Sequence, residues 1–392
     1  MIKKLLTFIA MFSALHAAHA QEPIKIGMLL VDAGPYAAFM RFQTEPASLA
    51  VDTLNAAGGA LGRKYELVPQ GYNGTPAGAT AAVARLAQQQ GVTLITGFTS
   101  SGNTLAIASR LEGLNALLID GIAGADEITG KNCQRNLFRT AVNDTMNMNA
   151  LRASVKNSGA RTWNLLMADT TVGHDYARQF TSLVQESGGV VQTTLFAPLG
   201  TTDFGSLISQ LSEKPADGLV VTVTGAAAIA LAKQQQQFGL FAKYKTLLSS
   251  YFTNDLWLAA QGDATVGVVS SQSYAWEMPG AENAAFVAAF EARFKRKPTF
   301  ADADTFTNFQ LVHAAIIKAK STEAVPVRSA LSGLKAATVL GAVEMRAADN
   351  QLLRPIAIVK VGRDSASKPA IQLQSVVPAA NVVGAPSGDC KF

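Results

Sequence analysis

From residue 24 onward the chain alternates short apolar runs with longer amphipathic segments. Short apolar runs rich in β-branched residues are typical of buried strands, whereas apolar residues spaced three and four apart are typical of helices. Strands that alternate with helices predict a parallel sheet with helices on its faces. In the first series we expect strands at 24–31, 64–70, 93–97 and 116–120, and helices at 44–57, 77–90 and 104–114.

A second series of the same kind starts after Arg139. Its strands are expected at 162–168, 190–196, 218–223 and 245–249, and its helices at 146–158, 176–187, 204–211 and 226–238. Two such series predict two doubly wound α/β units in tandem. Sheets of this kind bind ligands in the crevice at the carboxyl ends of their strands.

The remainder of the chain is patterned differently. Residues 268–340 return to helical periodicity, most clearly at 283–294 and 305–320, and a late strand is expected at 355–361. The segment 363–392 carries Pro, Ser and Ala without strong periodicity. We expect it to be a loose tail unless a disulfide from Cys390 holds it.

The first 20 residues have the three parts of a secretory signal peptide: Lys3 and Lys4, an apolar run over 5–15, and Ala18-His19-Ala20. No Cys stands directly after the expected cleavage site, and no later run approaches the roughly 20 apolar residues that a membrane span needs. The sequence therefore predicts a soluble protein that is exported to the periplasm of a Gram-negative cell.

Charge and histidine content exclude several functions. Without Lys3 and Lys4, 31 basic residues face 28 acidic ones, and no cluster of Lys and Arg suggests a nucleic-acid partner. Only His174 and His313 remain outside the signal peptide, too few for a zinc site, so we expect no metal and no cofactor.

The chain has two cysteines, Cys133 and Cys390. An even pair in an exported chain indicates a disulfide more often than two free thiols, because the periplasm is oxidising.

The stretch 97–104 leaves an expected strand and enters an expected helix. The hydroxyls of Ser100 and Ser101, with the free N–H groups of a helix N-terminus, could bind an anion such as a carboxylate. The same serines could instead be plain N-caps. The glycine-containing turn 120–125 follows the next strand, where a backbone can approach a ligand closely.

Enzyme motifs are missing from the sequence. It has no G-x-S-x-G nucleophile elbow, no G-x-G-x-x-G sequence and no phosphate-binding loop. A catalytic triad would have to use His174 or His313, and His313 lies in an apolar helical pattern that favours a structural role. We therefore expect a binding protein and not an enzyme, with a secreted α/β hydrolase as a rival interpretation.

Several short segments come in the order and spacing of one protein family; they are 24–27, 34–39, 49–52, 55–59, 61–63, 97–101, 138–140, 202–204 and 238–240. With them the chain resembles the type I periplasmic binding proteins of ABC importers, in the leucine/isoleucine/valine-binding group. The resemblance implies an α/β fold of two doubly wound parallel-sheet lobes joined by three crossovers. It implies lobe one at 22–141 plus 273–345, lobe two at 142–272 plus 346–362, and a C-terminal tail at 363–392 tied to lobe one by the disulfide.

The same resemblance implies a function and its partners. A small-molecule ligand is expected to be trapped between the lobes by hinge closure, and the closed form is expected to be recognised by an inner-membrane ABC permease. The protein is expected to be a monomer. A sensory binding protein of the same fold, which passes its signal to a receptor, is the alternative.

Carried onto this chain, the resemblance places a ligand-carboxylate contact at Ser101 beside Ser100, and an aromatic wall at Phe39. Backbone contacts fall on Ile122, Ala123 and Gly124. The expected site is completed by the polar and aromatic residues Tyr176, Thr224, Tyr251 and Trp276.

The chain departs from the amino-acid binders at two of these positions. Gly124 stands where they place a hydroxyl for the ligand's ammonium group, and Tyr251 stands where they place an acid. Burying an ammonium group without a counter-charge costs several kcal/mol. This departure argues against a free α-amino acid, unless Asp120, Asp169 or Asp175 substitutes. We therefore expect a small carboxylate or amide with an apolar or aromatic body, with a branched-chain amino acid as the alternative.

Overall fold

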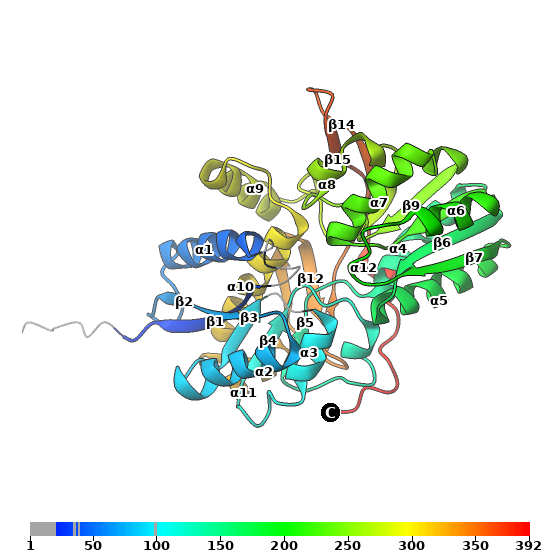
Figure 1. Ribbon diagram of the computed structural model, residues 1–392. Helices are drawn as coiled ribbons and strands as arrows, with labels where there is room; N and C mark the ends of the chain where they lie inside the picture. Colours follow the sequence, from blue (N-terminus) through cyan, green and yellow to red (C-terminus); the bar gives the residue numbers. More distant parts are fainter. Residues whose placement is uncertain (1–20, 34–36, 38–39, 98–99) are drawn as a thin grey trace, which may run out of the picture.

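The computed structural model describes residues 21–33, 37, 40–97 and 100–392, which form two α/β lobes (Figure 1). Phe39 lies outside the described residues, so its expected place in the site stays a prediction. Chain segments cross between the lobes three times, after β5, after β10 and before β14. Within the described residues, no helix has the length and hydropathy needed to cross a membrane.

The first lobe is built on a five-stranded parallel sheet in the order β2-β1-β3-β4-β5. Alternate residues of β1 enter two different apolar clusters, because successive side chains of a strand point to opposite faces: Met28 and Leu30 pack on one side, Leu29 and Val31 on the other. The strands are β1 (Ile24–Val31), β2 (Tyr65–Tyr72), β3 (Leu94–Gly97), β4 (Leu117–Asp120) and β5 (Leu137–Arg139).

Helices cover both faces of this sheet (Figure 1). They are α1 (Arg41–Ala56), α2 (Pro76–Ala84) with a π-helical turn η2 (Arg85–Gln89), α3 (Ser101–Ala108), α9 (Ala281–Phe294), α10 (Phe300–Ala319) and α11 (Ala324–Leu331). A small antiparallel sheet joins them, made of β11 (Lys335–Thr338), β12 (Gly341–Met345) and β13 (Leu352–Leu353).

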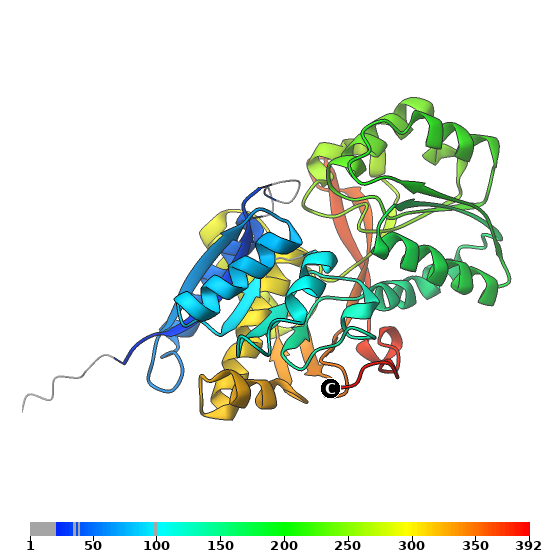
Figure 2. The ribbon, with the colours of Figure 1, turned by 60° about the horizontal axis from the view of Figure 1, so that its bottom comes forward.

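The second lobe contains a seven-stranded sheet in the order β15-β14-β10-β9-β8-β6-β7. Five strands are parallel: β6 (Thr162–Ala168), β7 (Val190–Ala197), β8 (Gly218–Val221), β9 (Thr246–Ser250) and β10 (Val269–Gln272). The strands β14 (Ile356–Arg363) and β15 (Pro369–Val377) add antiparallel pairs at one edge, on the side of this lobe that faces the first (Figure 2). The helices of this lobe are α4 (Asp144–Asn157), α5 (Thr171–Glu186), α6 (Gly205–Glu213), α7 (Gly225–Phe238), α8 (Leu258–Gln261) and α12 (Ala379–Val382), with 3-10 turns η4 (Phe241–Lys243) and η5 (Gly262–Thr265). A further 3-10 turn, η3 (Asp126–Ile128), lies between β4 and β5 of the first lobe.

The segment 363–392, expected to be a loose tail unless a disulfide held it, contains a strand that was not predicted in addition to that disulfide. Strand β15 pairs with the whole length of β14, from Ile356 opposite Val377 to Arg363 opposite Pro369. Helical patterning over 268–340 was also an incomplete prediction, because β10 and β11 interrupt it. The helix expected at 104–114 begins at Ser101 and ends at Ala108. The exact bounds of the lobes stay a prediction.

The two cysteines form a disulfide, as expected. Cys133 and Cys390 are bonded with their Cα atoms 5.5 Å apart, inside the range that disulfides require. Cys133 lies in the loop that precedes β5, so the bond fixes the end of the chain to the first lobe.

Candidate ligand-binding site between the lobes

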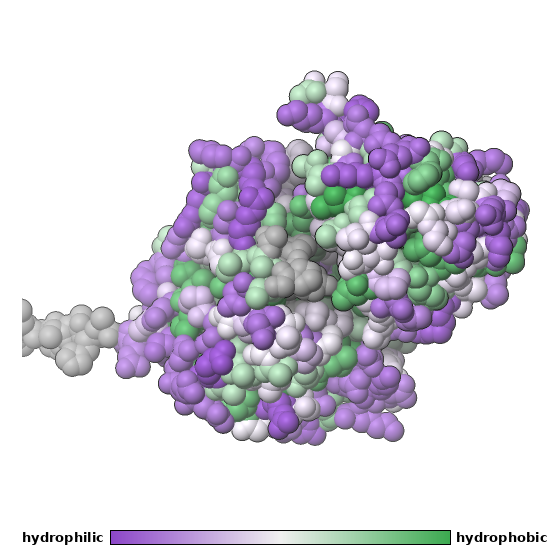
Figure 3. All heavy atoms as spheres, viewed as in Figure 1, coloured by the Kyte–Doolittle hydropathy of each residue, from purple (hydrophilic) through white to green (hydrophobic). Residues whose placement is uncertain are grey.

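A pocket lies where the three crossovers meet. Figure 3 shows that hydrophilic residues predominate along the outer rim of this face of the molecule. The empty space is about 450 Å³, part of it open to solvent. Segments of both sheets and of all three crossover regions come close to it, so its walls come from both lobes. It is lined by Gly121, Ile122, Ala141, Val142, Asn147, Tyr251, Thr253, Asn254, Ser271, Gln272, Ser273, Phe300 and Asp304.

The first-lobe side is organised by the end of β3 and the start of α3. Gly97 has a φ of 134°, and a Cβ there would lie 2.3 Å from the carbonyl oxygen of Leu29, so only glycine fits. Ser100 is the N-cap of α3, with its hydroxyl accepting from the Asn103 N–H. The Ser101 hydroxyl accepts from the N–H of Ala125 at 3.2 Å. Ser100 therefore has the capping role, and Ser101 joins α3 to the turn after β4.

The turn after β4 is held by Asp120. Its carboxylate accepts from the N–H groups of Ile122 at 2.9 Å and Ala123 at 3.0 Å, and from the Thr104 hydroxyl. Ile122 consequently reaches the pocket, while Ala123 is 2% exposed behind it. Asp120 is thus engaged in shaping the turn.

The other two acids considered as ammonium partners are also engaged elsewhere. Asp169 pairs with His174 at 2.7 Å, and Asp175 pairs with Arg178 at 2.7 Å; both pairs are partly exposed. Neither acid lines the pocket described above. A ligand cation in this pocket would have to meet other acids.

Tyr251 follows β9 and has a φ of 71°, a left-handed conformation that is rare for a residue with a side chain. Its hydroxyl donates to Oδ1 of Asp144 at 3.0 Å and accepts from Nδ2 of Asn147 at 2.8 Å. Burial raises the pKa of Asp144 well above its ordinary value, and burial followed by the Asp144 charge does the same for Tyr251. Gly124 lies against this pair, because a Cβ there would be 2.9 Å from the Tyr251 hydroxyl.

The remaining expected residues lie around the pocket rather than in its lining. Tyr176 is fully buried, and its hydroxyl bonds to Ser250. Thr224 is the N-cap residue of α7, and its side chain makes no capping bond. Trp276 is 36% exposed with the Lys297 ammonium 4.6 Å from its ring centre. The structure thus brings Ile122 and Tyr251 into the pocket lining.

Sequence reasoning missed several residues that line the pocket, among them Asn147, Gln272, Phe300 and Asp304. Gln272 ends β10, and its Oε1 has no hydrogen-bond partner among the described residues although the side chain is 6% exposed. No local motif marks this residue. Only its place at the carboxyl end of a strand could have pointed to it, and that strand was not predicted.

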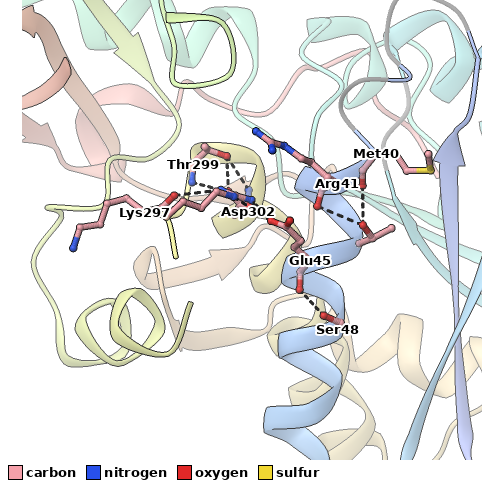
Figure 4. A network of polar contacts seen from close by, with 9 residues as sticks. Met40, Arg41, Glu45, Ser48, Lys297, Thr299 and Asp302 are labelled. Carbon is pink, nitrogen blue, oxygen red and sulfur yellow. Dashed lines mark hydrogen bonds and ion pairs between the residues drawn. The ribbon is translucent and has the colours of Figure 1, made fainter. Parts of the chain in front are cut away.

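Phe300 reaches the pocket from the first turn of α10, which is held in place by polar contacts (Figure 4). Thr299 and Asp302 form a capping box at the start of this helix. Arg296 bonds to Asp302 at 2.7 Å and to Glu45 of α1 at 2.5 Å. These contacts fix the start of α10 against α1.

Arg354 connects the three crossovers. Its guanidinium group is fully buried and donates to the carbonyl oxygens of Thr140 at 3.1 Å and Ser273 at 2.5 Å, and to Oδ1 of Asp304 at 2.5 Å. Thr140, Ser273 and Arg354 each belong to a different crossover. Ser273 also holds Asp304, the acid that pairs with Arg354, because its hydroxyl donates to Oδ2 of Asp304 at 2.9 Å.

His313 has the structural role that its position in α10 indicated. Its Nδ1 lies 2.8 Å from the Tyr65 hydroxyl, away from the pocket lining. Among the described residues, no group of three or more His, Cys, Asp and Glu side chains is arranged to hold a metal ion.

Comparisons with known proteins agree with this architecture. A leucine-, isoleucine-, valine-, threonine- and alanine-binding protein of Pseudomonas aeruginosa is 27% identical over 277 residues, which is 70% of this chain and 72% of that protein. An ABC transporter substrate-binding protein from Sphaerobacter thermophilus superposes with a TM-score of 0.84 at 26% identity, over 91% of this chain and 98% of that one.

A solute-binding protein from Rhodopseudomonas palustris, solved in complex with 4-hydroxybenzoate, has a TM-score of 0.83 at 21% identity, and covers 91% of this chain and 97% of its own. At that identity the likeness concerns the fold. The sequence profile of the periplasmic binding protein family matches residues 23–367. The chain therefore belongs to the periplasmic binding protein family, with the type I architecture of its leucine/isoleucine/valine-binding group.

Proposed function

We propose that this protein captures a small solute in the periplasm and delivers it to an inner-membrane ABC permease, without chemistry of its own. The observation that carries the proposal is the pocket at the meeting point of the three crossovers, with walls from both lobes. A ligand that contacts both walls binds a closed form better than an open one, and so shifts the population toward closure. Closure about a hinge is how two-lobed receptors sequester their ligands.

The proposed ligand is a small carboxylate or amide with an apolar or aromatic body. The N-terminus of α3, with Ser100 and Ser101, offers a favourable environment for a carboxylate, since helix N-termini carry partial positive charge. Ile122, Val142 and Phe300 supply apolar lining for the body. The R. palustris protein in complex with 4-hydroxybenzoate supports this class, and the P. aeruginosa relative supports a branched-chain amino acid as the alternative.

Location, partner and oligomeric state belong to the same proposal. The signal-peptide pattern over residues 1–20 supports export to the periplasm. Membership of a family of transporter receptors supports an ABC permease as the partner. We propose that the protein acts as a monomer, because each chain has both walls of its own pocket.

A thermal-shift panel on the mature protein, followed by titration calorimetry, tests the ligand class. Benzoate, 4-hydroxybenzoate, leucine and valine are the first probes. We expect at least one aromatic carboxylate to raise the melting temperature, because a ligand that binds only the folded state stabilises it by mass action. Stabilisation by leucine or valine, with none by aromatic acids, would overturn the proposed class and favour the alternative.

Two variants locate the binding. Ser101→Ala removes the hydroxyl that joins α3 to the turn after β4, so it should weaken binding. Ser329→Ala is the matched control: its hydroxyl donates to the Val325 carbonyl on α11, and binding should not change. If Ser101→Ala binds the ligand as tightly as Ser329→Ala does, the result would argue against a carboxylate site at α3.

The two rivals make different predictions. A sensory receptor would lack neighbouring genes for permease and ATPase subunits, whereas an importer receptor would have them. A hydrolase would turn over small esters, and turnover abolished by Ser101→Ala would overturn the proposal of a pure binding protein.

A further inference from the structure

We propose that the Tyr251 hydroxyl acts as a hydrogen-bond acceptor for the bound solute, so that the pocket selects solutes with an O–H or N–H donor in addition to their carboxylate. This inference rests on the proposed function and names one specificity determinant of the same site. Tyr251 lines the pocket from the second lobe, across from Ile122 of the first.

The bonds of Tyr251 decide which role its hydroxyl can play. A phenol has one proton to donate and oxygen lone pairs to accept with. The proton is committed to Oδ1 of Asp144, and one lone pair accepts from Nδ2 of Asn147. A ligand can therefore reach only the remaining acceptor capacity of this oxygen.

Asp144 is placed so that it keeps the proton of Tyr251. It is the first residue of α4, follows the N-cap Asn143, and is fully buried. Its second oxygen, Oδ2, has no hydrogen-bond partner among the described residues. Oδ1 of Asp144 can accept the Tyr251 proton whether the carboxyl group is ionised or carries a proton on Oδ2. Asp144 is a positioning residue, since it acts through Tyr251.

Gly124 leaves room for this arrangement. A Cβ at this position would lie 2.9 Å from the Tyr251 hydroxyl and 3.4 Å from Oδ1 of Asp144. Any larger residue would push the hydroxyl away from the turn that follows β4. The left-handed backbone of Tyr251 indicates that the fold holds this side chain in place against local preference.

Gln272 adds a second acceptor to the same wall. Its Nε2 donates to the carbonyl oxygen of Thr253 at 2.9 Å, which fixes the orientation of the amide. Its Oε1 is left without a partner among the described residues, in a side chain that is 6% exposed and lines the pocket. Two acceptors on one wall match a donor on the ligand, and a site built this way rejects an analogue that lacks the donor.

Titration calorimetry on the mature protein with two matched pairs tests the inference. The first pair is 4-hydroxybenzoate and benzoate, and the second is leucine and 4-methylpentanoate, so the arms separate a hydroxyl donor from an ammonium donor. In at least one pair we expect wild type to bind the donor-bearing member at least about tenfold more tightly, the factor that corresponds to one good hydrogen bond.

The variants assign that preference to the hydroxyl. Tyr251→Phe should bring the ratio within a pair close to one while the affinity for the donor-lacking member stays similar. Asp144→Ala should also reduce the ratio, because it frees the Tyr251 proton, whereas Asp144→Asn retains an acceptor oxygen and should preserve it. Tyr244→Phe is the matched control: the Tyr244 hydroxyl bonds to Asn164 and to the Leu211 carbonyl inside the second lobe, and the ratio should not change.

Circular dichroism shows whether each variant is folded, and Gly124→Ala gives a second perturbation that moves the hydroxyl without removing it. Equal binding of both members of each pair by wild type would overturn the inference and leave the proposed function intact. A ratio that Tyr251→Phe does not change would also overturn it. Binding of none of the four probes would overturn the proposed ligand class and this inference together.

Discussion

Removing either partner of the buried ion pair between Arg354 and Asp304 should destabilise the protein strongly. Both side chains are buried, at 0% and 2% exposure, and Arg354 also donates to carbonyl oxygens of the other two crossovers. The variants are Asp304→Asn, Arg354→Met and the double variant.

The expected magnitude follows from the burial of the charges. Removing one partner of a buried pair leaves an uncompensated charge and typically costs about 3–5 kcal/mol. In Asp304→Asn, Arg354 keeps two carbonyl partners, so we expect a value near the lower end. In Arg354→Met, Asp304 can take up a proton, since burial already raises its pKa, but two carbonyl groups lose their donor.

The double variant separates the charge interaction from general damage. It removes both charges, so its cost should be smaller than the sum of the two single costs by at least about 2 kcal/mol, as found for residues in one network. Urea unfolding followed by circular dichroism gives the free energies. The matched control is the exposed pair of Arg363 and Asp263, where Arg363→Met should cost less than about 1 kcal/mol. Single variants within about 0.5 kcal/mol of wild type, or strictly additive costs, would refute the reasoning.

Three further predictions concern stability. The double variant Cys133→Ser/Cys390→Ser opens a loop with a sequence separation of 257 residues, which the loop-entropy relation converts to a loss of up to about 5.5 kcal/mol; a melting temperature that reductant does not lower would contradict this. Burial, followed by nearby carboxylates, raises the pKa of Asp255 to about 7, so the folded state holds this proton longer than the unfolded state. Stability should fall as pH rises from about 4 to about 7, and Asp255→Asn should be more stable than wild type at pH 8 but not at pH 4, as measured by melting in both buffers. Gly173→Ala places a Cβ 1.9 Å from the carbonyl oxygen of Ala168 and should cost about 1–3 kcal/mol; unchanged urea unfolding would show that the start of α5 can shift freely.

The elements that the sequence predicts well are those whose own side chains carry the signal. Strand β6 has the predicted bounds, 162–168, and four of its five inner residues are buried apolar groups, the exception being Asn164. Strand β10 was missed because it reads Val-Ser-Ser-Gln. Ser270 and Ser271 are nonetheless buried, since their hydroxyls bond to Thr253 and Ser250. Polar residues buried by partners elsewhere in the chain give no local hydrophobic pattern.

The candidate site also contains some residues that the sequence could place and others that it could not. Ile122 could be placed from the sequence because it follows the carboxyl end of β4, where parallel sheets gather their binding residues, whereas the ligand contact expected at Ser101 stays a prediction. The role of Asp144 could not, since it depends on a contact with Tyr251, 107 positions along the chain. The sequence left Asp120, Asp169 and Asp175 open as substitutes for the missing ammonium partner, because it does not show what each carboxylate already binds.

The pocket and the three crossovers share residues, and this overlap suggests where ligand specificity can change. Ser273 and Asp304 line the pocket and also bond to Arg354, so a substitution at either would alter the crossovers along with the ligand contacts. Tyr251 and Gln272 line the same pocket without a bond to Arg354. Under the proposed function, a change at Tyr251 or Gln272 is expected to alter the ligand contacts while the Arg354 bonds that join the crossovers are kept. A ligand shifts the equilibrium between the open and closed forms only by the difference in its affinity for them. We therefore expect a new ligand to be accommodated most easily by changes at Tyr251 and Gln272, which leave the bonds between the crossovers in place.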